Sequence, residues 1–248
     1  MQGFDTFVFI IELVSITSFG ISGALTAIRK HMDVFGVIIV AVTTALGGGV
    51  IRDLLLGVIP PKSFNRPIYA IVTASFALMT FLIEYRHAKK HTPGEPFSGR
   101  FTEGAMFWLD TLGLAIFTAV GVAVAHESAV PDNAFLYCFV GVLTGVGGGV
   151  LRDLLCQNMP YIFVKHFYAS ACVVGAVVCQ VMWAPAGKVA AMLTGAGVIM
   201  LLRFLAAHFR WNLPRVPDMN APGMNPSSMD APSINAPDKN AADGKAQR

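Results

Sequence analysis

The chain has 248 residues, of which 54% are hydrophobic and 13% are charged, and its formal net charge at pH 7 is +3. The mean hydropathy of +0.60, together with the way the charges avoid long apolar runs, excludes an ordinary soluble domain and indicates an integral membrane protein. The small positive charge does not indicate nucleic-acid binding, because the basic residues lie in loops with no aromatic residues interleaved.

Seven apolar segments approach or exceed the roughly 20 residues that a membrane-spanning helix needs. In chain order, the expected spans are 4–28, 34–58, 67–84, 104–126, 134–157, 162–184 and 187–207. The first is interpreted as a retained helix and not as a secretory signal, because it lacks a basic N-terminal region and contains Asp5 and Glu12. The sequence therefore predicts an all-α membrane protein with seven transmembrane helices.

The distribution of Lys and Arg between the spans predicts the orientation of these helices. Three basic residues fall on the side of the N-terminus and ten on the opposite side. By the positive-inside rule the N-terminus is expected outside and the C-terminus in the cytoplasm, in the inner (plasma) membrane. The three are Lys62, Arg66 and Lys188, and the ten are Arg29, Lys30, Arg86, Lys89, Lys90, Arg100, Lys165, Arg203, Arg210 and Arg215.

Beyond the last span, residues 213–248 repeat Asn-Ala-Pro and Asp-Ala-Pro units and bury little apolar surface, so this segment is expected to be a disordered cytoplasmic tail. The four cysteines all fall in apolar spans without metal-ligand spacing, which favours small buried side chains over a disulfide or a metal site. They are Cys138, Cys156, Cys172 and Cys179.

An internal repeat is the strongest signal in the sequence. Gly-Gly-Gly-Val-Ile-Arg-Asp-Leu-Leu at 47–55 returns as Gly-Gly-Gly-Val-Leu-Arg-Asp-Leu-Leu at 147–155, and nine of the fourteen positions in 47–60 and 147–160 are identical. Because each repeat holds three spans, an odd number, the second is expected to be inverted about a pseudo-twofold axis in the membrane plane. The predicted organisation is a first three-helix repeat with its cytoplasmic loop at 1–91, a second, inverted repeat at 92–185, a seventh helix outside the symmetry at 186–212, and the tail at 213–248.

The glycine triplets predict a break in the middle helix of each repeat. Three consecutive glycines weaken a helix, and a break would free the carbonyls of Thr44 and its neighbours, and by symmetry those near Thr144, to face a cation. This interpretation makes Gly47, Gly48, Gly49, Gly147, Gly148 and Gly149 the hinges of a pore or binding site. The alternative is that the glycines only permit two helices to cross closely.

The charged pairs that follow the glycines are costly in hydrocarbon and need partners. Under the twofold relation Arg52 is expected to meet Asp153, and Arg152 to meet Asp53, as a crossed charge clamp beside the pathway. Capping of the following half-helix by the aspartates and snorkelling of the arginines to the interface are the alternatives.

Two further carboxylates, Glu12 and Asp110, occupy matched positions 98 residues apart. Carboxylates within spans attract cations or carry protons, so both are candidate pathway residues, with an interfacial position as the alternative. Hydroxyls are expected along the same wall, although Ser and Thr in helices commonly bond their own backbone. These are Thr17, Ser18, Ser22, Thr43, Thr44, Thr118 and Thr144.

The paired Gly-Gly-Gly-Val-x-Arg-Asp motifs, the two three-helix repeats and the seventh helix resemble the prokaryotic branch of the trimeric intracellular cation channel family, whose bacterial members also carry the name of a glycine-transporter domain. The resemblance covers residues 4–207. It implies a homotrimer, a potassium and sodium pore within each subunit formed by helices 1, 2, 4 and 5, and bends at the glycine motifs. Animal members place basic residues beside a phosphoinositide lipid near these bends, and Arg52 and Arg152 are the nearest matches here.

Two functions of different classes follow. The first is a passive channel for monovalent cations, which needs no cofactor beyond the permeant ion. The second is a secondary transporter for glycine or another small zwitterion, because inverted repeats also suit alternating access. An enzyme is not expected, since the sequence contains no His-Glu-x-x-His motif and no nucleophile elbow.

Overall fold

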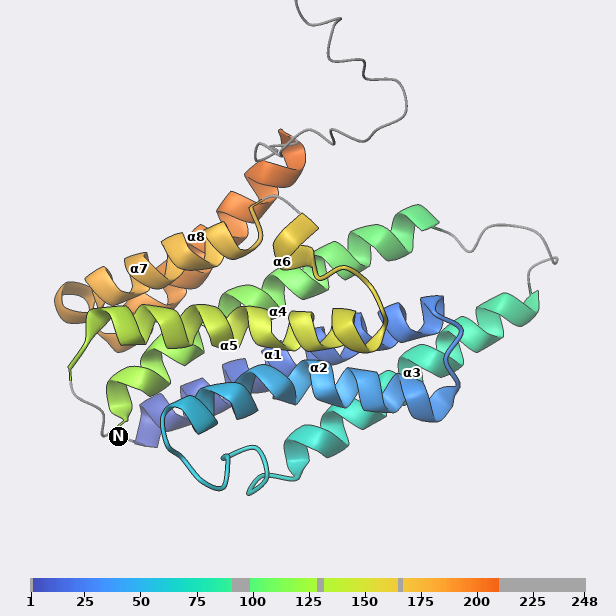
Figure 1. Cartoon of the computed structure of the whole chain (residues 1–248), viewed down its shortest axis with the longest axis horizontal. Coiled ribbons are helices and arrows are strands. Elements are labelled where there is room, and N and C mark those ends of the chain that lie inside the picture. Colours follow the sequence, from blue (N-terminus) through green and yellow to red (C-terminus); the bar gives the residue numbers. More distant parts are fainter. Residues whose placement is uncertain (1, 91–98, 129–131, 165–166, 210–248) are drawn as a thin grey trace, which may run out of the picture. The chain divides into compact units, whose positions relative to one another are not determined.

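The apolar segments of the chain are helices in the computed structural model, which describes residues 2–90, 99–128, 132–164 and 167–209 (Figure 1). In order they are α1 Gln2–Arg29, α2 Val34–Leu55, α3 Ile68–Lys90, α4 Gly99–Glu127, α5 Ala134–Leu155, α6 Tyr161–Val164, α7 Ala169–Ala186 and α8 Lys188–His208. Within the described ranges seven of these helices are long and apolar enough to cross a membrane, which confirms the predicted fold class. The predicted tail lies outside the described residues.

The middle helices of the two repeats begin and end in the same way. The side chain of Asp33 caps α2 by accepting a hydrogen bond from the Gly36 backbone at 2.7 Å, and Asn133 caps α5 by accepting one from Leu136 at 3.1 Å. Both helices then end at the second leucine of Leu-Leu, Leu55 in α2 and Leu155 in α5. The duplicated sequence therefore specifies duplicated helices of 22 residues each.

The sixth predicted span is shorter than expected. Residues 161–164 form a separate turn of helix, Phe167 has a φ of 62°, and the spanning helix α7 begins only at Ala169. A left-handed residue interrupts the helical backbone. The spanning helix α7 is thus 18 residues long, and the described residues 161–164 form a separate helical turn before it.

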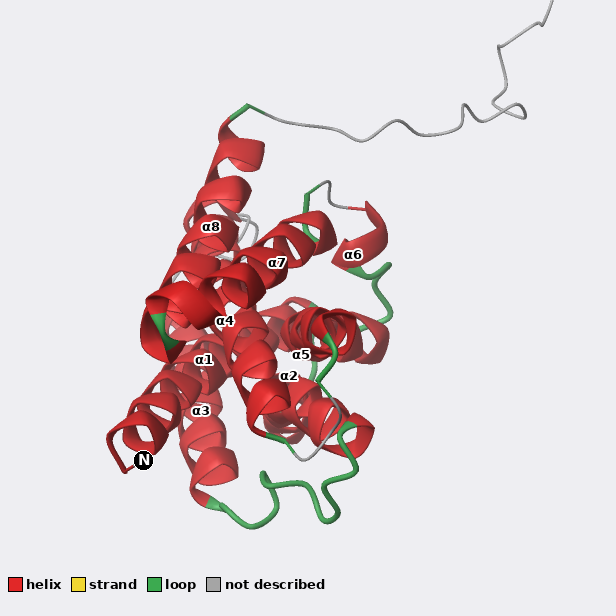
Figure 2. Ribbon diagram, turned by 90° about the vertical axis from the view of Figure 1, so that its left-hand side faces the viewer, coloured by secondary structure: helices red, strands yellow, loops and turns green. Residues whose placement is uncertain are grey.

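The helices form a layered bundle in which α1 contacts α2, α3, α4 and α5, and α4 contacts α1, α5, α7 and α8 (Figure 2). In each repeat the third helix packs on the first two: α3 contacts α1 and α2, and α7 contacts α4 and α5. The extra helix α8 pairs with α7 and also contacts α4. The outer faces of α3, α7 and α8 expose apolar side chains, as lipid contact requires; examples are Leu82, Ile83, Val177, Val181, Leu193 and Leu201.

Reciprocal contacts confirm that the second repeat is inverted. A Cβ atom on Gly48 would lie 2.2 Å from the carbonyl oxygen of Thr144, and one on Gly148 would lie 2.1 Å from that of Thr44. Contacts that exchange equivalent residues are those of a twofold axis. Position 44 of α2 meets position 148 of α5, and position 48 meets position 144. Since the residue number rises along one helix while it falls along the other, the two helices cross antiparallel. Ser15 of α1 likewise donates to the carbonyl of Gly113, its equivalent in α4, at 2.9 Å.

The predicted break at the glycine triplets is wrong, because α2 and α5 are helical through residues 47–49 and 147–149. The carbonyls of Thr44 and Thr144 therefore stay in helices and are not freed for a cation. Glycine lowers helix stability by about 1 kcal/mol relative to alanine, but broken backbone hydrogen bonds are costlier in hydrocarbon. The alternative reading is the correct one: these glycines let α2 and α5 cross with their backbones in contact.

Candidate functional site

The first polar cluster lies at the end of the bundle where α1 begins, which we call the first face. The Nε atom of Arg52 bonds Asp53 Oδ1 at 2.9 Å, and its Nη1 atom bonds Glu12 Oε1 at 3.3 Å. Tyr69, from the start of α3, donates its hydroxyl to Glu12 Oε2 at 2.7 Å. The other oxygen of Asp53 accepts the backbone N–H of Lys62 at 2.8 Å. One arginine thus joins α1 to α2, and one aspartate fixes the loop that follows α2.

The second polar cluster repeats this arrangement at the opposite end, the second face. Arg152 Nε bonds Asp153 Oδ1 at 2.9 Å, and Arg152 Nη1 bonds Asp110 Oδ1 at 2.7 Å. Tyr168, at the start of α7, lies 3.4 Å from the same Asp110 oxygen, and Asp153 accepts the backbone N–H of Tyr161 at 3.0 Å. The two clusters therefore have equivalent members.

The predicted crossed clamp is wrong. Each arginine pairs with the aspartate next to it in its own motif, and with the carboxylate of the first helix in its own repeat. Adjacent side chains leave a helix about 100° apart, but an arginine is long enough to fold its guanidinium back along the helix to the neighbouring carboxylate. Glu12 and Asp110, predicted as separate pathway residues, are thus members of the same networks as the Arg-Asp motifs.

Burial differs between the two clusters. Arg52, Asp53, Arg152 and Asp153 are all buried, so neither arginine snorkels to an interface and neither presents its guanidinium to a lipid headgroup at the surface. The Asp110 side chain is 3% exposed, whereas that of Glu12 is 13% exposed. Buried charges need complete sets of partners. The Nη2 atom of Arg152 is an exception, because it is buried without a hydrogen-bond partner.

Each cluster opens into a cavity. The first-face cavity has a volume of about 250 Å³ and is lined by Glu12, Arg52 and Tyr69, with Ile16 and Phe117 at its inner end. The second-face cavity has a volume of about 200 Å³, and its lining includes Ser22, Met106, Phe107, Asp110, Tyr161 and Arg203. The fold therefore places one polar cavity at each end of the α1, α2, α4 and α5 core.

An aromatic barrier separates the two cavities. Along α1, Ile16 lines the first cavity and Ser22 lines the second, so Phe19 lies between them. Its ring is fully buried and packs against Phe117, the residue 98 positions later, with 5.5 Å between ring centroids. At a rise of 1.5 Å per residue, the six residues from 16 to 22 correspond to a barrier of about 9 Å. Among the described residues, the two cavities have no lining residue in common.

The predicted wall of hydroxyls is only partly present. Thr44 and Thr144 donate to the carbonyls of Val40 and Val140 in their own helices, both at 2.6 Å, and Thr118 donates to Leu114 at 2.8 Å. Thr17 and Ser18 also bond their own helix. Ser22 is different, because its oxygen accepts a bond from Arg152 Nη1 at 2.9 Å and so connects the two repeats.

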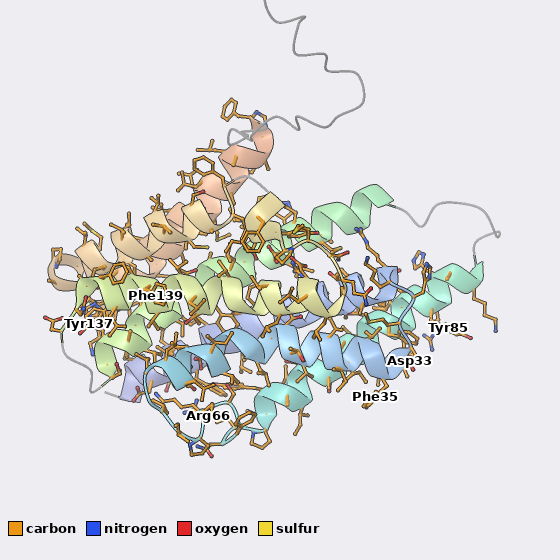
Figure 3. All side chains as sticks on the ribbon, viewed as in Figure 1. Asp33, Phe35, Arg66, Tyr85, Tyr137 and Phe139 are labelled. Carbon is orange, nitrogen blue, oxygen red and sulfur yellow. The ribbon has the colours of Figure 1, made fainter. Side chains whose placement is uncertain are left out.

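Sequence reasoning missed four members of the clusters. Tyr69 and Tyr168 recur at a spacing of 99 residues, which was an available signal of a shared role. Arg203 is the single charge inside the apolar run of α8, and a lone charge in a span points to a buried partner. Arg66 carries no such signal, because it lies in the loop before α3, where basic residues are expected (Figure 3).

The geometry defines a class of protein: a polytopic membrane protein of two inverted three-helix repeats, with a buried charged cluster and a polar cavity at each membrane face. The comparisons with known proteins give the family. A family model described as glycine transporter matches residues 9–85 and 107–184, the two repeats in turn. The chain belongs to this family of bacterial membrane proteins.

Curated relatives and solved structures agree with this assignment. The chain is 31% identical over 206 residues to the inner membrane protein YadS of Escherichia coli. The aligned region covers 83% of this chain and 93% of YadS. A solved TRIC cation channel is 34% identical, covers 86% of this chain and 98% of its own, and superposes with a TM-score of 0.72. The trimeric intracellular cation channel orthologue of Rhodobacter sphaeroides is 28% identical. The superposition covers 83% of this chain and 100% of the orthologue, and its TM-score is also 0.72. The resemblance drawn from the repeated motifs is confirmed.

Proposed function

We propose that the protein is a cation channel for potassium and sodium, with a pore inside each subunit that runs from the first-face cavity to the second-face cavity. The observation that carries the proposal is the arrangement of two polar cavities, each holding a carboxylate of the repeat, on either side of a short aromatic barrier. The similar solved structures, which are TRIC cation channels, support the same function. The structure corresponds to a closed state.

Carboxylates favour cations at both entrances. Glu12 is a partly exposed member of the first cluster, and its charge draws cations into that cavity. Selectivity among cations is expected to be weak. The backbone of α2 and α5 stays helical, so the described residues provide no ring of free carbonyls of the kind that separates potassium from sodium.

The proposed assembly is a homotrimer in the inner membrane. The apolar outer faces of α3, α7 and α8 provide surface for lipid and for neighbouring subunits. The excess of basic residues on the side of the second face supports a cytoplasmic second face, with the N-terminus outside and the C-terminus inside.

The test is a recording of the purified protein in a planar bilayer under a potassium chloride gradient. We expect discrete current steps whose reversal potential lies near the potassium equilibrium potential and shifts little when sodium replaces potassium. Glu12→Gln is expected to lower the cation preference, while Glu84→Gln on α3 is a control outside both cavity linings described above. A reversal potential at the chloride value would contradict the proposal.

A secondary transporter for glycine is the second candidate. The description of the matching family model and the presence of cavities on both faces favour it, because alternating access uses two such cavities in turn. Uptake of labelled glycine into proteoliposomes distinguishes the two. Saturable, ion-coupled uptake without current steps would favour the transporter, and steps without uptake favour the channel.

A further inference from the structure

The helix outside the repeat supplies a charge to only one of the two clusters. Arg203 of α8 is 6% exposed and reaches the second cluster, where its Nη2 atom lies 3.3 Å from Asp110 Oδ2 and its Nε atom donates to the Thr111 hydroxyl at 2.8 Å. Its guanidinium carbon lies 4.5 Å from the centre of the Tyr168 ring and 5.1 Å from that of Phe107. The side chain is thus held by a carboxylate, a hydroxyl and two aromatic faces.

The first cluster has an arginine in a similar place but holds it differently. Arg66 lies over the ring of Phe9, the equivalent of Phe107, at 5.4 Å, and it donates to the Tyr69 hydroxyl at 3.2 Å. This hydrogen bond raises the pKa of the Arg66 guanidinium above its usual value. Arg66 does not bond Glu12 directly, and it is exposed in a loop, as Figure 3 shows.

The result is a difference in charge between two otherwise equivalent clusters. In the first, the carboxylates of Glu12 and Asp53 share the buried Arg52. In the second, Asp110 and Asp153 are balanced by two buried arginines, Arg152 and Arg203. A guanidinium stays protonated at any physiological pH. A cation that enters from the second face therefore meets a carboxylate, Asp110, that two arginines already hold.

We propose that Arg203 is a tethered cation that keeps the second-face entrance closed, and that conduction requires its displacement from Asp110 by a movement of α8. The inference rests on the proposed channel function. α8 is suited to such a movement because it lies outside the inverted repeat and is joined to α7 by Gly187 alone, whose φ is 81°. Asp110 keeps its bond to Arg152 when Arg203 leaves, so its charge remains partly compensated.

Single-channel recording of variants tests this role. Arg203→Gln removes the tethered charge and is expected to raise the open probability about tenfold. The reason is that the closed state loses a charged hydrogen bond, which destabilises it relative to the open state. Arg203→Lys retains the charge and is expected to stay near the wild-type open probability. Arg86→Gln is the control, because Arg86 is exposed on α3 and lines neither cavity, and it is expected to leave opening unchanged.

A second variant covers the case in which Arg203→Gln does not fold. Thr111→Val removes the hydroxyl that accepts from Arg203 while keeping both charges, and a several-fold rise in open probability is expected. Wild-type opening in folded Arg203→Gln or Thr111→Val, or equal effects of Gln and Lys at position 203, would overturn the inference. Absence of cation steps in every variant, wild type included, would instead contradict the channel function itself.

Discussion

The carbonyl oxygen of Thr144 lies 2.2 Å from the position that a Cβ atom on Gly48 would take. The equivalent oxygen of Thr44 stands in the same relation to Gly148, at 2.1 Å. The two repeats therefore touch through backbone at their twofold axis, and no residue with a side chain fits at position 48 or 148 without separating α2 from α5.

Gly48→Ala is accordingly expected to destabilise the protein by about 1 to 3 kcal/mol, as overpacking of a tight contact does. Gly197→Ala in α8 is the matched control, because a Cβ there meets nothing within 4 Å. The control is expected to be neutral or to stabilise by up to about 1 kcal/mol through helix propensity. Thermal unfolding in detergent measures both, and equal melting temperatures for the two variants would contradict the close crossing.

The pairing of charges within each repeat predicts a specific pattern of coupling. Arg152→Gln removes the ion pair of the buried Asp153 and one of the two ion pairs of Asp110, and it is expected to cost on the order of 3 to 5 kcal/mol. Arg152→Gln combined with Asp110→Asn should show a coupling energy of about 0.5 to 3 kcal/mol, whereas Arg152→Gln with Asp53→Asn should be additive within about 0.5 kcal/mol. Unfolding free energies of the three single and two double variants test this. Strong coupling between positions 152 and 53 would restore the crossed clamp.

Gly149 lies so close to Tyr168 that a side chain at position 149 would clash with the tyrosine hydroxyl. A Cβ on Gly149 would lie 2.7 Å from the Tyr168 hydroxyl, so Gly149→Ala is expected to lower the melting temperature by several degrees, about 1 to 3 kcal/mol. Tyr168→Phe removes that oxygen and should recover most of the loss. Gly49→Ala, the equivalent change in the first repeat, meets Ser63 at 3.6 Å and Arg52 at 3.9 Å, both ordinary van der Waals contacts, and is expected to be tolerated. Failure of Tyr168→Phe to rescue would show that the clash lies elsewhere.

The hydroxyls of Thr44 and Ser22 are expected to differ in importance. Thr44 bonds its own helix, so Thr44→Val should change stability by less than about 1 kcal/mol and leave ion selectivity unaltered. Ser22→Ala removes a partner of the buried Arg152 and should cost about 1.5 to 3 kcal/mol. Melting temperatures together with reversal potentials give the comparison. A large selectivity change in Thr44→Val would return this threonine to the wall of the pathway.

Apolar length and the repeated motif were sufficient to predict the seven spans, their order and the inversion, because hydrophobic thickness and an odd number of helices per repeat leave few other arrangements. The same reasoning singled out Glu12, Asp110 and the Arg-Asp motifs as candidate site residues, and the structure groups them into two clusters. Charged residues inside a membrane span cost free energy, and this cost alone identifies them as candidate functional residues.

The sequence did not predict how these residues pair. Whether Arg52 meets Asp53 or Asp153 depends on side-chain reach over a few ångströms, which spacing along a helix does not fix. The glycines were misread for a related reason: a triplet that weakens an isolated helix also permits a close crossing, and the choice between these is made by the facing helix. Arg203 was missed because it belongs to α8, which the repeat does not describe.

The central claim is that ions pass through each subunit between the two cavities, and cysteine accessibility tests it most directly. In a chain whose four cysteines are replaced, Ile16→Cys places a thiol in the first-face cavity, while Val14→Cys, 42% exposed on the same helix, does not line it. A charged, membrane-impermeant methanethiosulfonate reagent is expected to reduce the single-channel current of Ile16→Cys and to leave that of Val14→Cys unchanged. An unchanged current in Ile16→Cys, with or without labelling shown by mass spectrometry, would place the conduction path outside this cavity.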